Sequence, residues 1–200
     1  CKWNYLAHEA QFSESLLREV GLETLLTKIP DTILDVAECV GKLSPQAAQA
    51  LGLPEEVVVA SGMIDAHAGG VALTGSHPEG TLALISGTSN CHMLASQTEI
   101  HTPGVWGPYF SAMVPGLWLI EGGQSAAGAA IERLLSFHPA APQARQLAQE
   151  SDLPLPVYLA DRLLQTFSTA SEAVNLAAGL HVVPEFLGNR APFADPHARA

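Results

Sequence analysis

The stretch GMIDAHAGG at residues 62–70, together with SGTSN at residues 86–90, indicates both the fold and the chemistry of this chain. Each glycine-rich turn follows a β-type run, at 57–60 and at 81–85. The first turn presents one carboxylate, Asp65, where a strand of an α/β protein usually carries functional groups. The second offers backbone N–H groups and small hydroxyls, which suit an anion. Phosphoryl transfer to a hydroxyl needs a proton acceptor and a phosphate cradle, so we predict this reaction class.

Outward from these turns, apolar periodicity and turn residues predict an α/β chain with strands grouped as hairpins before the helices. A boundary near residue 60 separates helical, polar sequence from strand-and-glycine sequence. Ser44 and Pro45 predict a capped helix that Gly52 closes. The other predicted helices lie within 1–20 and at 21–30, 65–73, 126–137, 142–150, 157–168 and 170–178, and the predicted strands at 57–63, 81–86, 91–96, 106–114, 117–120 and 181–183.

The composition indicates a globular chain, since 48% of its 200 residues are hydrophobic and 14% are charged. A net charge of −11 with only nine Lys and Arg residues argues against a nucleic-acid partner. No apolar run has the length of a membrane span, and no signal peptide opens the chain. Cys1, Cys39 and Cys91 are odd in number and far apart, which favours reduced thiols in a cytoplasmic protein.

Each turn also has a purely structural interpretation. Asp65 could serve only as the N-cap of a helix that starts at Ala66. The Gly87-Thr88-Ser89 turn could be an ordinary connection between two hairpin strands. Its functional interpretation is an anion nest, in which successive N–H groups and hydroxyls bind a phosphate.

The stretch EGGQS at 121–125 lies between a predicted strand and an Ala-rich helix. Glu121 at the strand end could hydrogen-bond a polyol, and the helix N-terminus behind it could favour an anion. The same stretch approximates the nucleophile elbow of serine hydrolases, although Ala127 replaces the last glycine. A serine hydrolase would use Ser125 as nucleophile, with the acid and base drawn from Asp152 or Asp161 and from His181 or His197.

The histidines allow a metal-site hypothesis as well. Asp65 and His67 could bind a metal ion together with His92 or His101. There is, however, no HExxH motif and no pair of histidines at helical spacing. We therefore assign no metal ligands.

Taken in order, the motifs resemble those of FGGY-type carbohydrate kinases. They are CKW at 1–3, the turn at 62–70, SGTS at 86–89, EGGQS at 121–125 and FLGNRAP at 186–192. Within that family the chain most resembles the ribulokinase-like pentulose kinases, because its catalytic turn reads Ile-Asp-Ala-His. The resemblance covers nearly the whole chain.

The resemblance implies two actin/hexokinase-like (ribonuclease H-like) α/β domains with the active site in the cleft between them. Residues 1–60 would end the N-terminal domain, and residues 61–200 would open the C-terminal one. It also implies that Asp65 is the general base for the terminal hydroxyl of a ribulose-like ketopentose, with ATP and Mg²⁺ as cofactors. Matching positions would contact the sugar (Lys2, Asp65, Glu121), the transferred phosphate (Gly87, Thr88, Ser89) and the nucleotide side (Gly122, Gly123, Gln124).

Two motifs of that family are absent from these residues: the Asp-x-Gly-Thr phosphate loop and the glycine-rich adenosine-binding segment. Residue 189 is Asn where relatives often have Glu, so we assign it no role. We expect the chain to be part of a longer protein and residues 1–200 alone to be inactive as a kinase, because half of the positioning apparatus is missing. A truncated relative that binds a sugar or a partner without catalysis is the alternative. The sequence does not fix the oligomeric state, and a homodimer is compatible with it.

Overall fold

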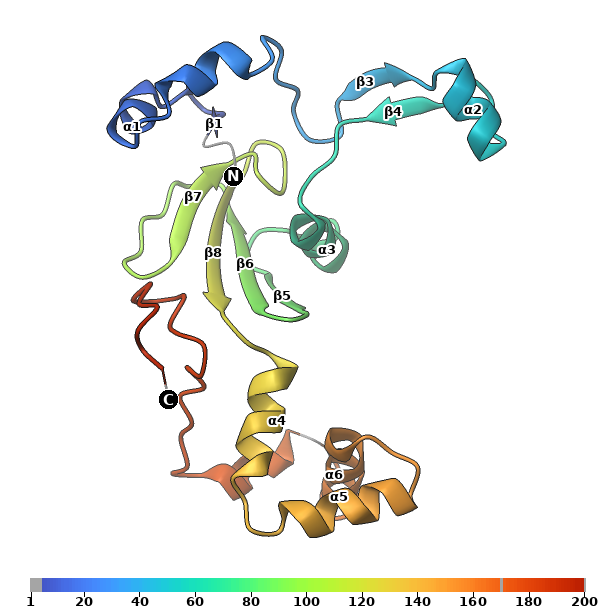
Figure 1. The fold of residues 1–200 in the computed structure, drawn as a ribbon, viewed down its shortest axis with the longest axis vertical. Helices are drawn as coiled ribbons and strands as arrows, with labels where there is room; N and C mark the ends of the chain where they lie inside the picture. Colours follow the sequence, from blue (N-terminus) through green and yellow to red (C-terminus); the bar gives the residue numbers. More distant parts are fainter. Residues whose placement is uncertain (1–4, 170, 200) are drawn as a thin grey trace. The chain divides into compact units, whose positions relative to one another are not determined.

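The computed structural model describes residues 5–169 and 171–199, which form two compact units. Within these residues, the first unit runs to Ile85 and resumes from Cys91 to Gly123. The second comprises Ser86–Asn90 and the chain from Gln124 onward. Figure 1 colours the elements of both units along the chain. The predicted mixture of helices and strands is confirmed, and it differs in detail at several elements.

Among the described residues, the first unit begins with a small antiparallel hairpin that the sequence did not predict, followed by the helix predicted within 1–20. Strand β1 (Tyr5–Leu6) pairs with β2 (Gln11–Phe12), and helix α1 covers only Glu14–Glu19. Ser13 starts α1, because its side chain accepts a hydrogen bond from the N–H of Leu16. Such a cap needs non-helical backbone at Ser13, so the helix cannot extend back through the hairpin. The predicted helix at 21–30 is a 3₁₀ turn, η1 (Glu23–Lys28).

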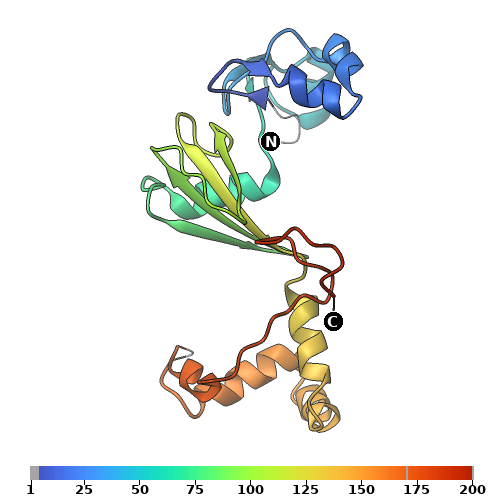
Figure 2. The ribbon, with the colours of Figure 1, turned by 90° about the vertical axis from the view of Figure 1, so that its left-hand side faces the viewer.

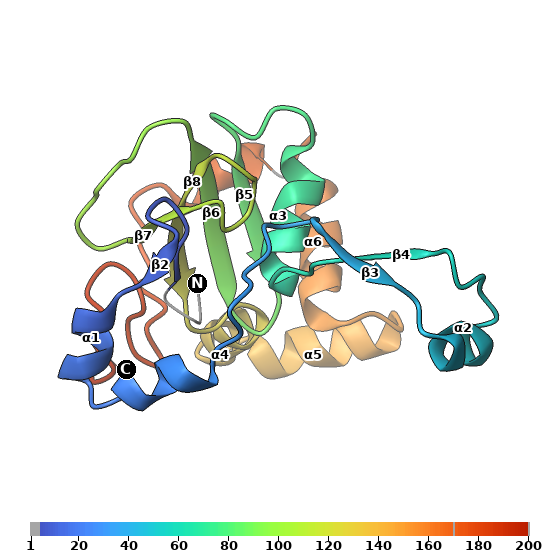
Figure 3. The same cartoon turned by 90° about the horizontal axis from the view of Figure 1, so that it is seen from above.

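A second hairpin joins β3 (Cys39–Lys42) to β4 (Val58–Ala60), with helix α2 (Pro45–Leu51) in the connection (Figure 3). Both predicted ends of helix α2 are confirmed. Ser44 accepts from the N–H of Ala47 at 3.2 Å, and Gly52 closes the helix in the left-handed region at φ 65°. Strand β4 is shorter than the predicted 57–63, and its Val58 is 59% exposed.

The main sheet carries the core of the first unit. Its strand order is β5-β6-β8-β7, and β7 pairs antiparallel with β8. The strands are β5 (Leu82–Ser86), β6 (Asn90–Ser96), β7 (Trp106–Phe110) and β8 (Trp118–Gln124). Helix α3 (Asp65–Thr74) lies along one face of this sheet, as Figure 2 shows. The core cluster beneath it consists of Ala83, Met93, Ala95, Met113 and Leu119.

Gly70 lets α3 approach the sheet closely. A Cβ atom at this position would lie 2.5 Å from the sulfur of Met113 and 3.4 Å from that of Met93. The glycine thus occupies the point where helix and core methionines meet. Because the buried residues of α3 are His67, Gly70 and Thr74, one face of the helix is set against the sheet.

The second unit is mainly helical. It contains α4 (Gly128–Ser136), α5 (Ala141–Glu150), α6 (Leu155–Leu164) and the 3₁₀ turn η2 (Glu172–Ala177). The predicted strand at 181–183 is wrong, because these residues form no ladder and Val183 is 70% exposed. An isolated β-type run without a pairing strand gains neither hydrogen bonds nor burial. None of the helices among the described residues is long and apolar enough to cross a membrane.

Candidate functional site

Asp65 is the first residue of α3 and is exposed to solvent. Its Oδ1 accepts a hydrogen bond from the N–H of the next residue, Ala66, at 2.8 Å. The N-cap position belongs to Ile64, whose side chain cannot cap, so the interpretation of Asp65 as the N-cap is wrong. The carboxylate instead lies within the first turn, where the positive end of the helix dipole favours a negative charge.

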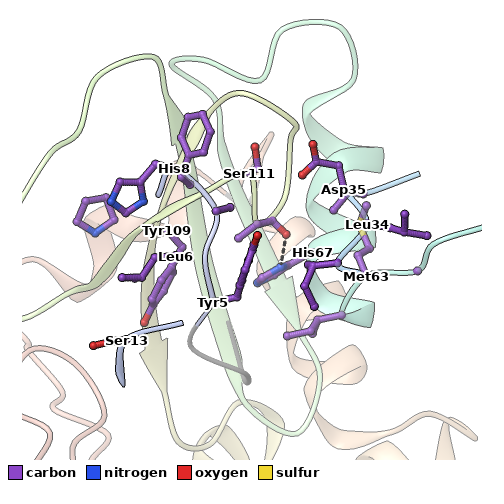
Figure 4. A pocket seen from close by; sticks show the side chains of 18 of the residues that line it. Tyr5, Leu6, His8, Ser13, Leu34, Asp35, Met63, His67, Tyr109 and Ser111 are labelled. Carbon is purple, nitrogen blue, oxygen red and sulfur yellow. Dashed lines mark hydrogen bonds between the residues drawn. The ribbon is translucent and has the colours of Figure 1, made fainter. Parts of the chain in front are cut away.

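His67, two residues further along, points the other way. Its side chain is 3% exposed, and its Nδ1 lies 2.9 Å from the backbone oxygen of Ala112 (Figure 4). Its Nε2 lies 3.8 Å from Oε2 of Glu121. The first turn of α3 therefore presents one carboxylate to solvent and brings one imidazole to a second carboxylate.

Glu121 lies inside strand β8 rather than at the end of a strand. The predicted strand 117–120 continues to Gln124, so Glu121, Gly122 and Gly123 have extended, paired backbone, with Trp106 of β7 opposite Glu121. Gly122 leaves room on this strand, because a Cβ there would meet only the Cβ of His92, at 3.9 Å. The predicted turn beginning at Gly122 is wrong because glycine, although it weakens a strand, can still lie within one.

Tyr109 on β7 belongs to the same environment. Burial and, as the second cause, the negative charge of Glu121 raise the pKa of the Tyr109 hydroxyl. The phenol is thus kept in its neutral form beside the carboxylate.

A hollow of about 690 Å³ lies beside this turn in the first unit. Figure 4 shows His67 on its wall, with Tyr5 and His8 from the N-terminal hairpin and Tyr109 from the sheet. The remaining lining is largely aliphatic and aromatic, with Ser13, Asp35 and Ser111 as further polar groups. Such a lining gives shape to a site and offers only a small number of directional contacts.

The loop of residues 86–90 belongs to the second unit. Gly87 and Thr88 are exposed, and a Cβ at Gly87 would meet no atom within 4 Å. The N–H of Gly87 bonds to the oxygen of Ser89 at 3.0 Å, which makes the turn tight. The carbonyl of Thr88 accepts from the N–H of Ala127, just before α4, at 3.1 Å.

Hydrogen bonds of two side-chain amides, those of Asn90 and Gln124, connect the loop to the end of β8. Ser86 donates to Oδ1 of Asn90 at 2.7 Å, and Nδ2 of Asn90 donates to Oε1 of Gln124 at 3.2 Å. Nε2 of Gln124 in turn donates to the oxygen of Ala126 at 2.8 Å. Both ends of the Gln124 amide are engaged within the protein, so this residue shapes the loop through Asn90.

The structure thus connects the sequence-predicted residues in two separate groups. Glu121 is joined to the turn of Asp65 through His67. Gln124 is joined to the loop of Gly87, Thr88 and Ser89 through Asn90. Lys2 lies outside the described residues. Sequence reasoning missed the roles of His67, Asn90 and Tyr109. For His67, the helical spacing to Gly70 and Thr74 was the available signal.

The geometry disfavours the two other chemistries. Ser125 donates its hydroxyl to the carbonyl of Gly188 at 3.1 Å, whereas a serine nucleophile would donate to a histidine. Within the described part of the chain, no three His, Cys, Asp or Glu side chains gather closely enough to hold a metal ion. The structure therefore does not assemble a metal site from Asp65, His67 and either His92 or His101.

Comparison with known families places these motifs in context. The profile of the C-terminal domain of the FGGY family of carbohydrate kinases matches residues 82–200. An FGGY carbohydrate kinase domain-containing protein of Xenopus laevis is 41% identical over 98% of this chain, and its human counterpart is equally similar. A D-ribulokinase of Saccharomyces cerevisiae is 32% identical over the whole chain. The chain spans 38% of the length of the two vertebrate relatives and 33% of the yeast one.

Solved structures give the same picture of the fold. A xylulose kinase from Rhodospirillum rubrum superposes with a TM-score of 0.57 and 27% identity, over 86% of this chain and 32% of its own. A xylulose kinase from Brucella ovis superposes with a TM-score of 0.56 at 18% identity, over 98% of this chain and 35% of its own. The predicted fold class, part of a sugar-kinase fold, is confirmed by these likenesses.

Proposed function

Because this chain belongs to the FGGY family of carbohydrate kinases, we propose that the protein carrying it transfers a phosphoryl group from ATP to the terminal hydroxyl of a ketopentose. The observation that carries the proposal is the first turn of α3. It holds Asp65 exposed, at the positive end of a helix whose opposite face is locked against the sheet. In this role Asp65 accepts the proton of the attacking hydroxyl.

A base in this position needs rigidity and access. Gly70, packed against Met113 one turn further along, limits the movement of α3. The carboxylate keeps one oxygen on the N–H of Ala66, which orients it, and leaves the other available to a substrate hydroxyl. These features support general-base catalysis, which requires a positioned acceptor within hydrogen-bond reach of the proton.

We assign phosphate binding to the loop of Gly87, Thr88 and Ser89, and the nucleotide side to Gly122, Gly123 and Gln124. The exposure of Gly87 and Thr88 supports the first assignment, together with the hydrogen bonds from Ser86 through Asn90 to Gln124 behind the loop, which we call the amide relay. Because the relay occupies both ends of the Gln124 amide, Gln124 would act by shaping the loop. The chain carries a net charge of −11, so it offers no strong positive field to a triphosphate. Mg²⁺ bound with ATP would supply that charge neutralisation.

We propose a ribulose-like sugar as the substrate. The support is the similarity to a D-ribulokinase of yeast and to a ribulokinase of Staphylococcus aureus, which is 36% identical over 56% of this chain. Glu121, Lys2 and Asp65 would contact its hydroxyls. Because the chain covers about a third of the yeast relative, other sugar contacts would come from outside these residues.

The division into domains stays part of this proposal, with residues 1–60 ending one domain and 61–200 opening the next. So does the expectation that residues 1–200 alone have no kinase activity. Cytoplasmic location and a homodimer remain predictions from the sequence. Turnover by residues 1–200 alone, with contaminating kinases removed, would contradict the expected dependence on the rest of the protein.

The test is ADP release by the full-length protein with D-ribulose, L-ribulose, D-xylulose and glycerol. We expect release that depends on a ketopentose. Asp65→Asn should lower kcat by at least a hundredfold, the scale of general-base catalysis, and leave the KM for ATP nearly unchanged. Asp161→Asn, an exposed aspartate on α6, is the matched control and should keep full activity.

Two outcomes would count against the proposal. If Asp65→Asn retains most of the turnover, Asp65 is not the base. If no sugar supports ADP release although ATP binds to the folded protein, the non-catalytic alternative gains support.

A further inference from the structure

His67 is placed by packing rather than by the chemistry assigned to its neighbours. It lies on the buried face of α3 with Gly70 and Thr74, three and seven residues further on. That face is set against the core methionines at Gly70, so the ring of His67 cannot swing out to solvent without moving the helix. Its side chain is 3% exposed, which is unusual for a histidine with no assigned role.

The two ring nitrogens have different partners. A backbone carbonyl can only accept, so the contact of 2.9 Å with the oxygen of Ala112 places a hydrogen on Nδ1. This bond fixes the ring plane. It leaves Nε2 facing Oε2 of Glu121 at 3.8 Å, which is longer than a direct hydrogen bond. Because Nδ1 is already a donor, Nε2 attracts the carboxylate only in the imidazolium form, in which both ring nitrogens carry a hydrogen.

The surroundings make this contact effective. The side chain of Glu121 is only 16% exposed, so water screens the pair weakly. The neighbouring titratable group is Tyr109, whose pKa is raised by burial and by Glu121, so its hydroxyl stays neutral. Contacts in a free enzyme often tighten once substrate is bound, and a shift of less than 1 Å would bring Nε2 into hydrogen-bond range of Glu121.

We infer that His67 is the positioning residue of Glu121, so that one helical turn carries the base and also orients the carboxylate that binds the sugar. This inference rests on the proposed function of Glu121. The competing explanation is that His67 only anchors the Ala112 carbonyl and fills the core. The two explanations differ in which ring nitrogen matters.

Two substitutions separate the ring nitrogens. The amide of His67→Asn reaches roughly the position of Nδ1 and keeps a donor for Ala112, but it loses Glu121. The longer amide of His67→Gln reaches roughly the position of Nε2 and keeps a donor for Glu121. In the full-length protein we expect His67→Asn to raise the KM for the sugar roughly tenfold, the scale of one charge-assisted contact. The KM for ATP should stay within about twofold, and His67→Gln should restore most of the sugar KM.

Glu121→Gln provides the second arm. It should raise the sugar KM by itself, and adding His67→Asn should then have little further effect, since His67 acts through Glu121. Thermal unfolding is measured for the unmodified protein, for His67→Asn, for Glu121→Gln and for the double variant. The difference between the combined and the summed stability changes gives a coupling free energy between the two residues that does not depend on turnover.

The outcomes are distinct. A normal sugar KM in His67→Asn, beside a raised one in Glu121→Gln, overturns the inference and leaves the proposed function intact. A normal sugar KM in Glu121→Gln overturns the role of Glu121 and the inference with it. If no sugar is phosphorylated, the proposed function fails, and additive unfolding effects of His67→Asn and Glu121→Gln would overturn the inference independently.

Discussion

The first turn of α3 and the loop of residues 86–90 differ in the groups that each offers. In the turn, the groups to which we assign a role are side chains: the carboxylate of Asp65 and, through His67, that of Glu121. In the loop, Gly87 and Thr88 are exposed, and the polar side chains of Asn90 and Gln124 bond to each other. The two regions belong to different units of the structure.

The difference shows how each kind of chemistry is stabilised. Side chains that carry charge have to be held by packing of the helix that bears them, which Gly70 provides. A loop that works through its backbone is held by an amide relay, because its open face has no packing partner at Gly87. We therefore expect added side-chain volume to destabilise the first region, and loss of hydrogen bonds to destabilise the second.

The largest difference is expected between equal substitutions at the two glycines. Gly70→Val would force side-chain carbon into the space of the Met113 sulfur and should destabilise the protein by about 2–3 kcal/mol. Gly87→Val meets open space and should change stability by less than about 0.5 kcal/mol. Urea unfolding of both variants of the full-length protein measures this. Equal losses would show that the two regions are not packed differently.

The second effect concerns the relay. Gln124→Leu removes the acceptor of Asn90 and the donor to Ala126, and it should destabilise the protein by about 1–2 kcal/mol. The KM for ATP should rise several-fold while the sugar KM stays constant, because the change affects only the loop. Gln143→Leu on the exposed surface of α5 is the matched control for introducing a leucine. A raised sugar KM with a normal ATP KM would reverse the assignment of the loop.

The smallest effect is expected at Ser125. Ser125→Ala loses one hydrogen bond to the carbonyl of Gly188 and should destabilise the protein by about 1 kcal/mol. Kinase activity should stay within about twofold of the unmodified protein, and a fluorophosphonate probe should label neither form. Labelling that disappears in Ser125→Ala would instead favour the serine hydrolase alternative.

Short sequence patterns predicted the elements whose ends are set by capping residues. Helix α2 begins at a serine cap and ends at a left-handed glycine, and both were legible from Ser44, Pro45 and Gly52. The hairpin of β1 and β2 was missed because two-residue strands leave no periodicity, and the apolar residues nearby matched a helix. The run at 181–183 has β-type composition but no pairing partner, which composition cannot reveal.

The candidate site divides in the same way. Asp65 and the Gly87 loop were predicted because a carboxylate at a strand–helix junction and a small-residue turn are local patterns. Glu121 was found but placed at the end of its strand, because the two glycines after it indicated a turn although the strand continues through them. His67 was missed as a partner of Glu121, because the two are 54 positions apart and meet only when α3 packs on the sheet.

The sequence by itself therefore determined the family, and it identified the residues that carry charge or lie in small-residue turns, because these follow from residue type and short-range order. Only the tertiary structure decided which of them face solvent and which contact a neighbouring side chain. Burial of one face of α3 turns His67 inward and leaves Asp65 outside, and pairing of β8 brings Glu121 to that imidazole. Contacts of this kind depend on distances between elements, which no stretch of a single chain encodes locally.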